Sequence, residues 1–507
     1  EEKERQEEMK ICILGGGLAG FATAAALSKY ASYSTHPVEI NLIHNPTIKA
    51  LSVGESTQLP INNLFNFLEI NDFDWMKECD ATYKAGVKFE DFNYGTEYFF
   101  PLFHRPTFDK EVKDHNVKLW FLGRDTLGLT PDLSSFYFSG EQAPWLELNK
   151  LDDSVNSAYH FNATKLSNYL KTYAEGKGLK VYEDTFREPL KDSHGNIRAL
   201  ICNQQTHHAD LFIDCTGFKA LLIGNQEWLP FDTLLNHKVI RASIPYENKD
   251  IELKNYTTST ALRHGWCWDI PLWSHRSVGY VHSNKFASDV LIEAEFREMF
   301  GEVETDTISF KSGRYKNAWV KNVVGIGASY GFTEPLEATN ISAIVSSINA
   351  LTEALSKRDG NITTIDRDLY NYKVAGALDN YRFFIELHYI FALRSDTQYW
   401  RHICNDINWR YETNIKFSYD QLFRQLADDR VFYDYGEQLG ALFIAAGQDY
   451  SCLAKDQLTH PRTIGDDNYH FDKKHLLASK EWAEKNISDK PSSYQYLKQT
   501  IYNGRNY

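Results

Sequence analysis

Apolar and small residues near the start of the chain follow the pattern of a strand, a helix and a second strand. Residues 11–14 are an apolar run, residues 21–27 are mostly small or apolar, and residues 38–43 are apolar at alternate positions. Glycines occupy the turn between the first run and the helical stretch. This spacing predicts a β-α-β unit, the building block of open α/β sheets.

The turn of this unit reads Gly15-Gly16-Gly17-Leu18-Ala19-Gly20, which contains a G-x-G-x-x-G motif. Glycine suits Gly15 for the turn itself, Gly17 for close approach of a pyrophosphate, and Gly20 for packing of helix against strand. A tight turn without a ligand is the alternative, but the β-α-β context favours a nucleotide at the helix N-terminus.

The residue that ends the second strand departs from the usual pattern. An acidic side chain normally binds the ribose there, whereas this chain has His44-Asn45. Either His44 or Asn45 replaces it as a hydrogen-bond partner, or the ribose is held from elsewhere. NAD(P) is therefore less expected as the resident cofactor.

Two later segments look like strand ends of the same sheet. Residues 209–218 include Asp214-Cys215-Thr216-Gly217, and residues 322–329 include Gly325 and Gly327. Cofactor-type segments near residues 15, 214 and 327 imply a discontinuous nucleotide-binding domain with a substrate domain inserted into it.

The rest of the chain divides into a strand-rich and a helix-rich part. Strands are expected at about 240–283. Pro335 and the apolar spacing of Ile341, Ile344 and Ile348 predict a helix that starts near Pro335. From about residue 360 the chain is expected to be helical and aromatic.

Composition excludes several classes of protein. The 507 residues include 43% hydrophobic and 14% aromatic residues, and the net charge of −14 argues against nucleic acid or an anionic membrane as partner. Seven scattered cysteines without a C-x-x-C pair indicate reduced thiols in a cytoplasmic protein and no metal site. No run of 18 apolar residues is present to span a membrane, and residues 1–8 are expected to be a disordered leader or tag remnant.

Two tryptophans separated by one residue lie in the segment Gly265-Trp266-Cys267-Trp268-Asp269-Ile270-Pro271. On a strand, Trp266 and Trp268 point to the same face, and Pro271 ends regular pairing. The segment predicts a flat aromatic wall. Ordinary core aromatics are the alternative.

Lys84 and Glu337 each allow two interpretations. On a strand, Lys84 shares a face with Gly86, Lys88 and Glu90, which suggests a solvated polar face. A buried lysine, by contrast, would be a compact amine with a movable pKa. Glu337 could simply stabilise the first turn of a helix, or it could act with the amine in one cavity.

Several motifs together resemble the flavin-dependent halogenases of the tryptophan type, over about residues 9–410, and the overall impression suggests a phage-encoded member. The matching segments are Ser52-Val53-Gly54-Glu55-Ser56-Thr57 with Pro60, residues 83–89, residues 265–271, residues 332–339, and His388-Tyr389 with residues 394–400.

The resemblance implies an α/β fold of the FAD-binding, glutathione-reductase-like (aromatic-hydroxylase-like) type, with an inserted antiparallel sheet and a helical C-terminal region. The FAD-binding domain would comprise residues 9–90, 155–225 and 315–360. Residues 91–154 and 226–314 would form the sheet and loops of the substrate domain, and residues 361–507 would complete the substrate pocket.

The resemblance also assigns roles to residues. Lys84 and Glu337 would be catalytic, Thr339 and Asn340 would bind halide, and Asn340 stands where relatives have glycine. Trp266, Trp268, Ile270 and Pro271 would separate the flavin from the substrate. The residues implied in FAD binding are Gly15, Gly17, Leu18, Ala19, Gly20, Val53, Gly54, Glu55, Ser56, Thr57, Phe186, Ala328 and Ile341.

The implied reaction uses reduced FAD, O₂ and halide to make hypohalous acid, which Lys84 holds and delivers to an electron-rich aromatic. No second G-x-G-x-x-G is present for NAD(P)H, consistent with a separate flavin reductase. Residues 439–447 are mostly small and aliphatic, which favours indoles or phenols over free tryptophan and allows bromide or iodide. Relatives suggest a homodimer. The alternatives are an FAD-dependent aromatic hydroxylase and a catalytically silent FAD-binding protein.

Overall fold

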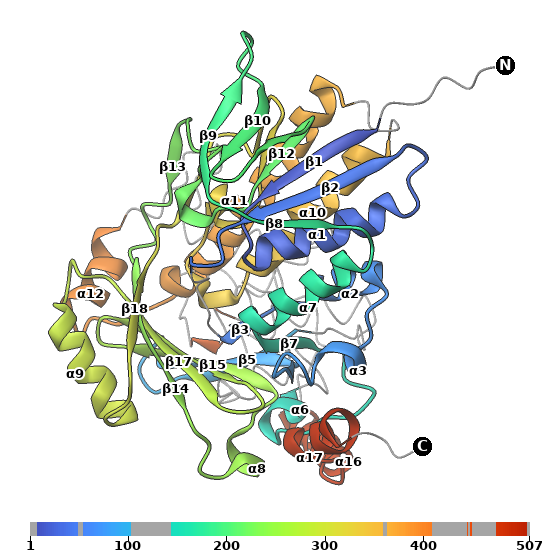
Figure 1. Ribbon diagram of the computed structural model, residues 1–507. Helices are drawn as coiled ribbons and strands as arrows, with labels where there is room; N and C mark the ends of the chain where they lie inside the picture. The colour runs from blue at the N-terminus through green and yellow to red at the C-terminus, as the bar shows by residue number, and fades with distance from the viewer. Residues whose placement is uncertain are drawn as a thin grey trace, which may run out of the picture.

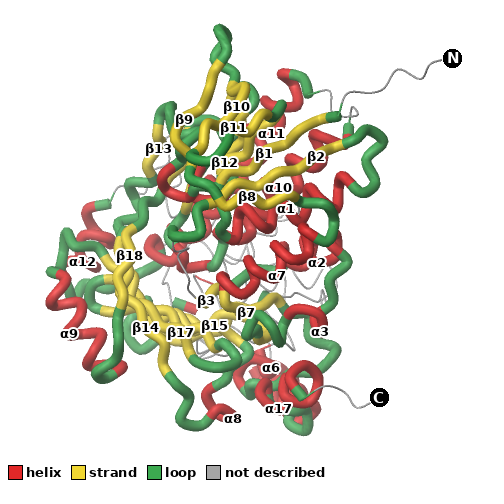
Figure 2. The backbone as a smooth tube through the Cα atoms, viewed as in Figure 1, coloured by secondary structure: helices red, strands yellow, loops and turns green. Residues whose placement is uncertain are grey.

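Two large sheets with helices between them organise the molecule. The computed structural model describes residues 8–48, 54–102, 143–357, 362–407, 444, 447–448 and 473–503. Figure 1 shows a mostly parallel sheet in the upper half and a larger, mostly antiparallel sheet in the lower half. Figure 2 shows helices α1 (Leu18–Ala31), α2 (Pro60–Leu68), α7 (Ala163–Glu175) and α10 (Asn340–Ser356) between them.

The upper sheet has six strands in the order β20-β21-β12-β1-β2-β8. All its pairings are parallel except the one between β20 and β21 at the edge. Three separate stretches of chain supply these strands, which are β1 (Met9–Leu14), β2 (Val38–His44), β8 (Lys180–Glu183), β12 (Leu211–Asp214), β20 (Trp319–Val320) and β21 (Val323–Gly325).

A small antiparallel sheet lies on the other side of the upper sheet from α1 and α10 (Figure 1). It consists of β9 (Phe186–Lys191), β10 (Ile197–Cys202) and β11 (Thr206–His208). Another three-stranded sheet consists of β13 (Trp228–Pro230), β19 (Gly313–Tyr315) and β22 (Gly331–Phe332).

The lower sheet has seven strands in the order β18-β14-β17-β16-β15-β5-β6. Helix α9 (Asp289–Phe300) packs on β14 and β17, and residues of α11 (Thr364–Ile390) join the apolar cluster that contains both tryptophans of β16. The strands are β5 (Gly86–Glu90), β6 (Glu97–Pro101), β14 (Lys238–Ile244), β15 (Tyr256–Leu262), β16 (Gly265–Pro271), β17 (Arg276–His282) and β18 (Asp306–Ser309).

A third small sheet brings together three segments that carry predicted site residues. Strand β7 (Ala158–Asn162) pairs with β3 (Gly54–Ser56) on one side and with β4 (Thr82–Lys84) on the other. Immediately after β4, the chain enters the lower sheet as β5, which pairs in parallel with β15. Lys84 is therefore the last residue before the chain changes sheets.

The remaining α-helices of the described part of the chain are mostly short. They are α3 (Asp72–Trp75), α6 (Ala143–Glu147), α8 (Lys249–Glu252), α12 (Gln398–Arg401), α16 (Lys473–Ile487) and α17 (Ser493–Leu497). None of the helices in the described ranges combines the length and apolar character that a membrane crossing requires.

The predicted α/β fold and its opening β-α-β unit are confirmed. The start predicted for the later helix is wrong. Residues Pro335–Glu337 form a single 3₁₀ turn, Ala338 takes a left-handed conformation with φ of 55°, and α10 starts only at Asn340. Glu337 thus lies before the helix and not in its first turn.

Candidate functional site

The glycine turn after β1 leaves open space at one position. Gly15 has φ of 119°, and a Cβ there would lie 2.3 Å from the carbonyl oxygen of Cys215. A Cβ at Gly20 would lie 1.9 Å from the carbonyl oxygen of Gly15. A Cβ at Gly17 would meet nothing within 4 Å, and no side chain caps α1. The free N–H groups of α1 therefore face a space that suits a pyrophosphate.

The three predicted cofactor segments lie side by side in the upper sheet. Leu14, which precedes the glycine turn, is in register with Asp214, and Asp214 is in register with Gly325. Ser329 donates a hydrogen bond of 2.5 Å to the carbonyl oxygen of Asp214. The carboxyl ends of these parallel strands meet at one edge, which is where such sheets bind ligands.

The surroundings of His44 and Asn45, at the end of β2, distinguish between these two candidates for binding the ribose. Asn45 is engaged within the protein, since it accepts hydrogen bonds from Thr47 and donates one to Thr185. His44 packs edge-on against Phe21, and its Nε2 is buried without a hydrogen-bond partner among the described residues. His44 is therefore the better placed of the two to bind a cofactor hydroxyl.

Lys84 is completely buried at the end of β4. Its Nζ donates a hydrogen bond of 2.8 Å to the carbonyl oxygen of Thr57. Burial lowers the pKa of Lys84 from its ordinary 10.5 to about 7, and the negative charge of Glu337 opposes that shift. Lys88, the other lysine of this segment, instead pairs with Glu90 and Glu97 at 2.8 Å each.

Glu337 is also completely buried. Its carbonyl oxygen accepts a hydrogen bond of 2.6 Å from the Gln58 side chain. Because Thr57 binds the Lys84 amine and the next residue binds Glu337, one short segment ties the predicted catalytic pair together. The Glu337 Oε2 atom has no hydrogen-bond partner among the described residues.

A buried hydrogen-bonded chain lies beside Lys84. His160 of β7 contacts the Thr82 hydroxyl at 3.0 Å through Nδ1 and the Thr257 hydroxyl at 2.9 Å through Nε2. Thr257 in turn contacts Ser56 at 2.8 Å. Burial, assisted by the charge of Lys84, lowers the pKa of His160 well below its usual range, so the ring is neutral. Lys84 is therefore the cation of this chamber.

The glutamate Oε1 atom meets a histidine that the sequence analysis did not place in the site. His388 Nε2 lies 2.5 Å from Glu337 Oε1, and His388 Nδ1 lies 3.2 Å from the Tyr98 hydroxyl. All three side chains are buried. The sequence could have indicated His388, since this residue is the first of one of the matching motifs, but no motif included Tyr98.

The two tryptophans of β16 are buried neighbours, with ring centroids 6.1 Å apart. The Trp266 indole donates a hydrogen bond of 2.6 Å to Glu334, which also accepts bonds from Asn236 and Tyr389. Burial raises the pKa of Glu334 to about 7. The Trp268 indole N–H has no partner among the described residues. The prediction of a flat wall is wrong, because the two ring planes are tilted by 56° within an apolar core cluster. Trp266 is fixed through Glu334, and a barrier role for the pair, called the tryptophan wall below, stays a prediction.

Thr339 and Asn340 lie at the N-terminus of α10, where no side chain caps the helix. The Asn340 amide binds Thr333 by accepting from its N–H at 3.2 Å and donating to its carbonyl oxygen at 3.0 Å. The side chain that replaces glycine is thus occupied by the preceding strand. Neither the backbone N–H of Thr339 nor that of Asn340 donates a hydrogen bond to a backbone group in the described part of the chain, so both are available to an anion.

The remaining residues predicted to bind the cofactor come from several different elements. Residues Leu18, Ala19, Phe186 and Ala328 are half-buried, while Gly54, Ser56, Thr57 and Ile341 are buried. Burial raises the pKa of Glu55 to about 7. Val53 lies outside the described residues, as do residues 439–447 apart from Ile444 and Gly447.

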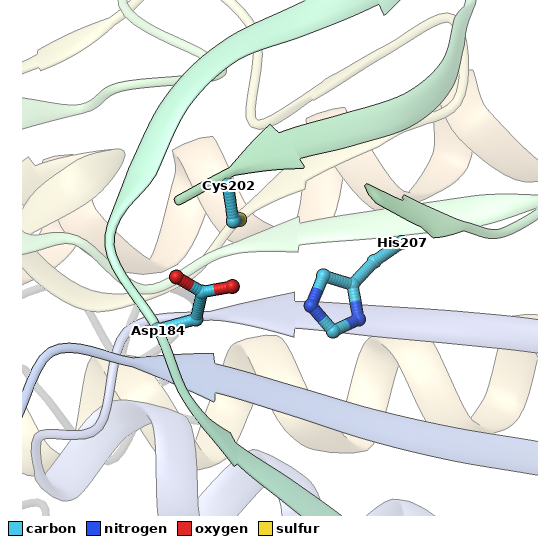
Figure 3. Close-up of side chains that lie close together, drawn as sticks. All are labelled: Asp184, Cys202 and His207. Atoms are coloured by element: carbon cyan, nitrogen blue, oxygen red, sulfur yellow. The ribbon is translucent and has the colours of Figure 1, made fainter. Parts of the chain in front are cut away.

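One group of side chains of metal-binding type lies away from this site, among the described residues (Figure 3). Asp184, Cys202 and His207 come from the ends of β8, β10 and β11, and their ligand atoms lie within 4.8 Å of one another. The Asp184 carboxylate already accepts hydrogen bonds from the backbone N–H groups of Thr185, Gln204 and Gln205. Asp184 therefore has a structural role, because these hydrogen bonds connect the β10–β11 turn to the end of β8.

Comparisons with known proteins agree on one family. A family model described as tryptophan halogenase matches residues 10–442. The 7-chloro-L-tryptophan 6-halogenase KtzR of Kutzneria sp. (strain 744) is 32% identical, over 77% of this chain and 81% of its own. The tryptophan 7-halogenase RebH of Lentzea aerocolonigenes is 32% identical, over 77% and 78%.

Solved structures give the same result. The apo structure of VirX1 is similar with a TM-score of 0.86 and 32% identity, and the match covers 98% of this chain and 100% of that one. The tryptophan 6-halogenase SttH from Streptomyces toxytricini has a TM-score of 0.82 and 28% identity, with 97% and 99% covered.

Proposed function

Because this chain belongs to the tryptophan halogenase family, we propose that it halogenates an electron-rich indole or phenol with hypohalous acid that Lys84 holds. Membership makes the protein a flavin-dependent halogenase, an oxidoreductase that uses reduced FAD and halide on an aromatic substrate and works with a separate flavin reductase. The observation that carries the residue assignment is the buried Lys84 amine, tied through residues 57–58 to the buried Glu337.

The edge of the upper sheet fits FAD. The open position at Gly17 and the uncapped start of α1 offer N–H groups to the pyrophosphate, and His44 offers an unpartnered nitrogen to the ribose. When bound, reduced FAD with O₂ supplies the oxidising equivalent that converts halide to hypohalous acid. The free N–H groups of Thr339 and Asn340 hold the halide.

Lys84 receives the oxidant on the far side of the tryptophan wall. An ammonium can donate a hydrogen bond to hypohalous acid, and its compact shape suits a closed chamber better than a guanidinium would. With a pKa of about 7, the amine is partly protonated at neutral pH. The charged form holds the acid, whereas the neutral form would instead form a haloamine.

Glu337 completes the substitution. As the ring carbon takes the halogen from hypohalous acid, the oxygen–halogen bond breaks and the oxygen leaves as water with a proton from Lys84. The carboxylate then takes the proton of that carbon, so that the C–H electron pair restores the aromatic ring. The Oε2 atom without a partner is the natural acceptor, because His388 occupies the other oxygen.

The substrate follows from the chemistry of the oxidant and from the sequence of the pocket segment. Electrophilic halogenation needs an electron-rich ring, and residues 439–447 contain a single aromatic side chain, Phe443, whereas an aromatic-rich segment is expected around free tryptophan. Indoles and phenols are therefore the preferred class, with bromide or iodide used as readily as chloride. The relatives KtzR and RebH carry tryptophan in their names, so tryptophan belongs in any substrate panel.

The proposal is tested by incubating the protein with a flavin reductase, NADH, FAD, each halide in turn, and a panel of indoles, phenols and tryptophan. Products with the isotope pattern of bromine or chlorine, or the mass shift of iodine, support it. Hydroxylated products alone would support an aromatic hydroxylase instead. FAD binding without any product would point to a silent FAD-binding protein.

A charge placed at Asn340 is expected to impair halide binding. Asn340→Asp keeps the shape but adds a negative charge beside the free N–H groups, which at about 5 Å costs roughly 3 kcal/mol in a partly screened site. The KM for bromide should rise more than about tenfold. The matched variant Asn340→Gly loses the bonds to Thr333 and about 1–2 kcal/mol of stability, yet should keep the halide KM. An unchanged KM in Asn340→Asp would place the halide elsewhere.

Opening the tryptophan wall is expected to change the product. Trp266→Ala removes a buried indole at a cost of about 3–5 kcal/mol and gives the arene access to the flavin side. Mass spectrometry should then show a hydroxylated fraction beside the halogenated product. Trp266→Phe keeps a ring while losing the bond to Glu334, and should retain the original ratio. If Trp266→Ala gives only halogenated product, the indole is not part of the barrier.

A further inference from the structure

A line of buried hydrogen-bonding groups ends on the Glu337 carboxylate. It runs from Gln448 through Tyr98 and His388 to Glu337, and the four side chains are at most 1% exposed. The reaction assigned above uses only the last of them. The first three come from positions far apart in the chain, so their convergence on one carboxylate oxygen requires an explanation.

The positions of the protons follow from the partners of each group. Burial raises the pKa of Tyr98 well above its ordinary value, so Tyr98 stays a phenol with one proton. The Gln448 amide hydrogen-bonds to the Tyr98 oxygen and donates to the His388 carbonyl oxygen at 3.0 Å. The phenol proton is therefore left for His388 Nδ1, 3.2 Å away. Since Nδ1 accepts, Nε2 carries the imidazole proton and donates it to Glu337 Oε1.

Aromatic packing fixes the rings of this line. The His388 ring packs against Phe89, with centroids 4.4 Å apart, and against the more distant Phe92 and Phe384. The Tyr98 ring stacks on Phe89 at 5.2 Å. On Gly447 a Cβ would come within 2.2 Å of the Tyr98 ring, so that only glycine fits there without displacing it. The imidazole cannot turn away from Glu337 without disturbing several neighbours.

We propose that His388 is a positioning residue that holds the Glu337 side chain in one orientation, with Tyr98 selecting the tautomer. The Nε2–H group occupies Oε1 and leaves Oε2 as the oxygen that takes the ring proton. This inference rests on the proposed role of Glu337, and its tests separate the two.

Kinetics give the first test. His388→Phe fills the ring space without an N–H donor, and its kcat for arene halogenation should fall about 10²-fold, while the KM for arene and the Kd for FAD change less than about twofold. His388→Gln, whose amide can donate in place of Nε2–H, should recover at least tenfold. His207→Gln, at a buried histidine on β11, is the control and should match the wild type.

Three results would overturn the inference. The first is a His388→Phe variant that keeps more than half of the wild-type kcat. The second is a His388→Gln variant no better than His388→Phe, and the third is equal loss of FAD binding in both variants; either of these would mark a merely structural residue. If His388→Phe fails to fold, Tyr98→Phe and His388→Gln carry the same comparison.

A spectroscopic test does not depend on turnover. In ¹⁵N-histidine-labelled protein, His388 should appear as the Nε2-protonated tautomer, with a slowly exchanging, far-downfield proton that shifts in Glu337→Gln. An Nδ1-protonated ring would refute the inference even in an active halogenase. If no arene is halogenated but this proton is present and responds to Glu337→Gln, the proposed function fails while the hydrogen-bonded pair stands.

Discussion

Replacing Lys84 by methionine is expected to abolish halogenation and to make the folded protein more stable. The amine is completely buried, and its pKa is lowered from 10.5 to about 7. Such a shift corresponds to at most about 5 kcal/mol that the folded state loses by burying the charge. Methionine fills a similar volume without that loss, while arene halogenation should fall at least about 10³-fold because nothing holds the oxidant.

The gain in stability should depend on pH in a defined direction. Below pH 7 Lys84 is protonated in both the folded and the unfolded chain, so the buried charge lowers the free energy of unfolding by its full amount. Between pH 7 and pH 10.5 the unfolded chain holds more protons than the folded chain, so wild-type stability contributed by this group rises with pH. The advantage of Lys84→Met in urea unfolding should therefore be largest at pH 6 and shrink toward pH 9.

Lys88→Met is the matched control, because Lys88 lies on the next strand, where its half-buried side chain pairs with Glu90 and Glu97. It should retain halogenation and change stability by less than about 1 kcal/mol. FAD binding should survive in both variants. Halogenation that persists in Lys84→Met would show that another group carries the oxidant.

Replacing Glu337 by glutamine is expected to lower the halogenation rate by about 10²-fold or more while leaving halide oxidation intact. Glutamine has the same shape but cannot accept the ring proton, and general bases contribute roughly 10²–10⁴ to such rates. In single turnovers with reduced FAD, the oxidised halogen should escape to a small trapping reagent in solution, and little arene product should form.

The buried carboxylate of Glu386 provides a control for this substitution. Burial raises the pKa of Glu386 to about 7, and its carboxylate binds the Thr233 hydroxyl outside the proposed site. Glu386→Gln should keep the wild-type rate. Equal loss of product and of trapped halogen in Glu337→Gln would mean that Glu337 acts earlier, in oxidising halide.

Local patterns were enough to predict the nucleotide half of the molecule. The roles of Gly15 and Gly20 depend on neighbours a few residues away or on the adjoining strand, and the structure shows the expected close contacts. The register of Leu14, Asp214 and Gly325 likewise follows from the rule that parallel strands end at one edge. The homodimer and the cytoplasmic location stay predictions.

The surroundings of Glu337 could not be predicted in the same way. Tyr98 and His388 are 290 positions apart, and their contact depends on how β6 and α11 pack. The left-handed conformation of Ala338 ends the turn at Pro335–Glu337, so that α10 begins later than predicted. Alanine has no preference for this conformation, so the sequence did not indicate it. The hydrogen bonds between the Asn340 side chain and the Thr333 backbone could not be predicted either. The motif shows only that glycine is replaced and not what the new side chain contacts.

The passage of the chain from β4 into β5 has a consequence for redesign. Lys84 ends a strand paired with β7, and two residues later the backbone belongs to the sheet that carries the tryptophan wall. A natural crossover point for chimaeras therefore falls just after the amine. Grafting the following stretch from a relative would exchange the sheet that carries the two tryptophans while preserving the anchorage of Lys84.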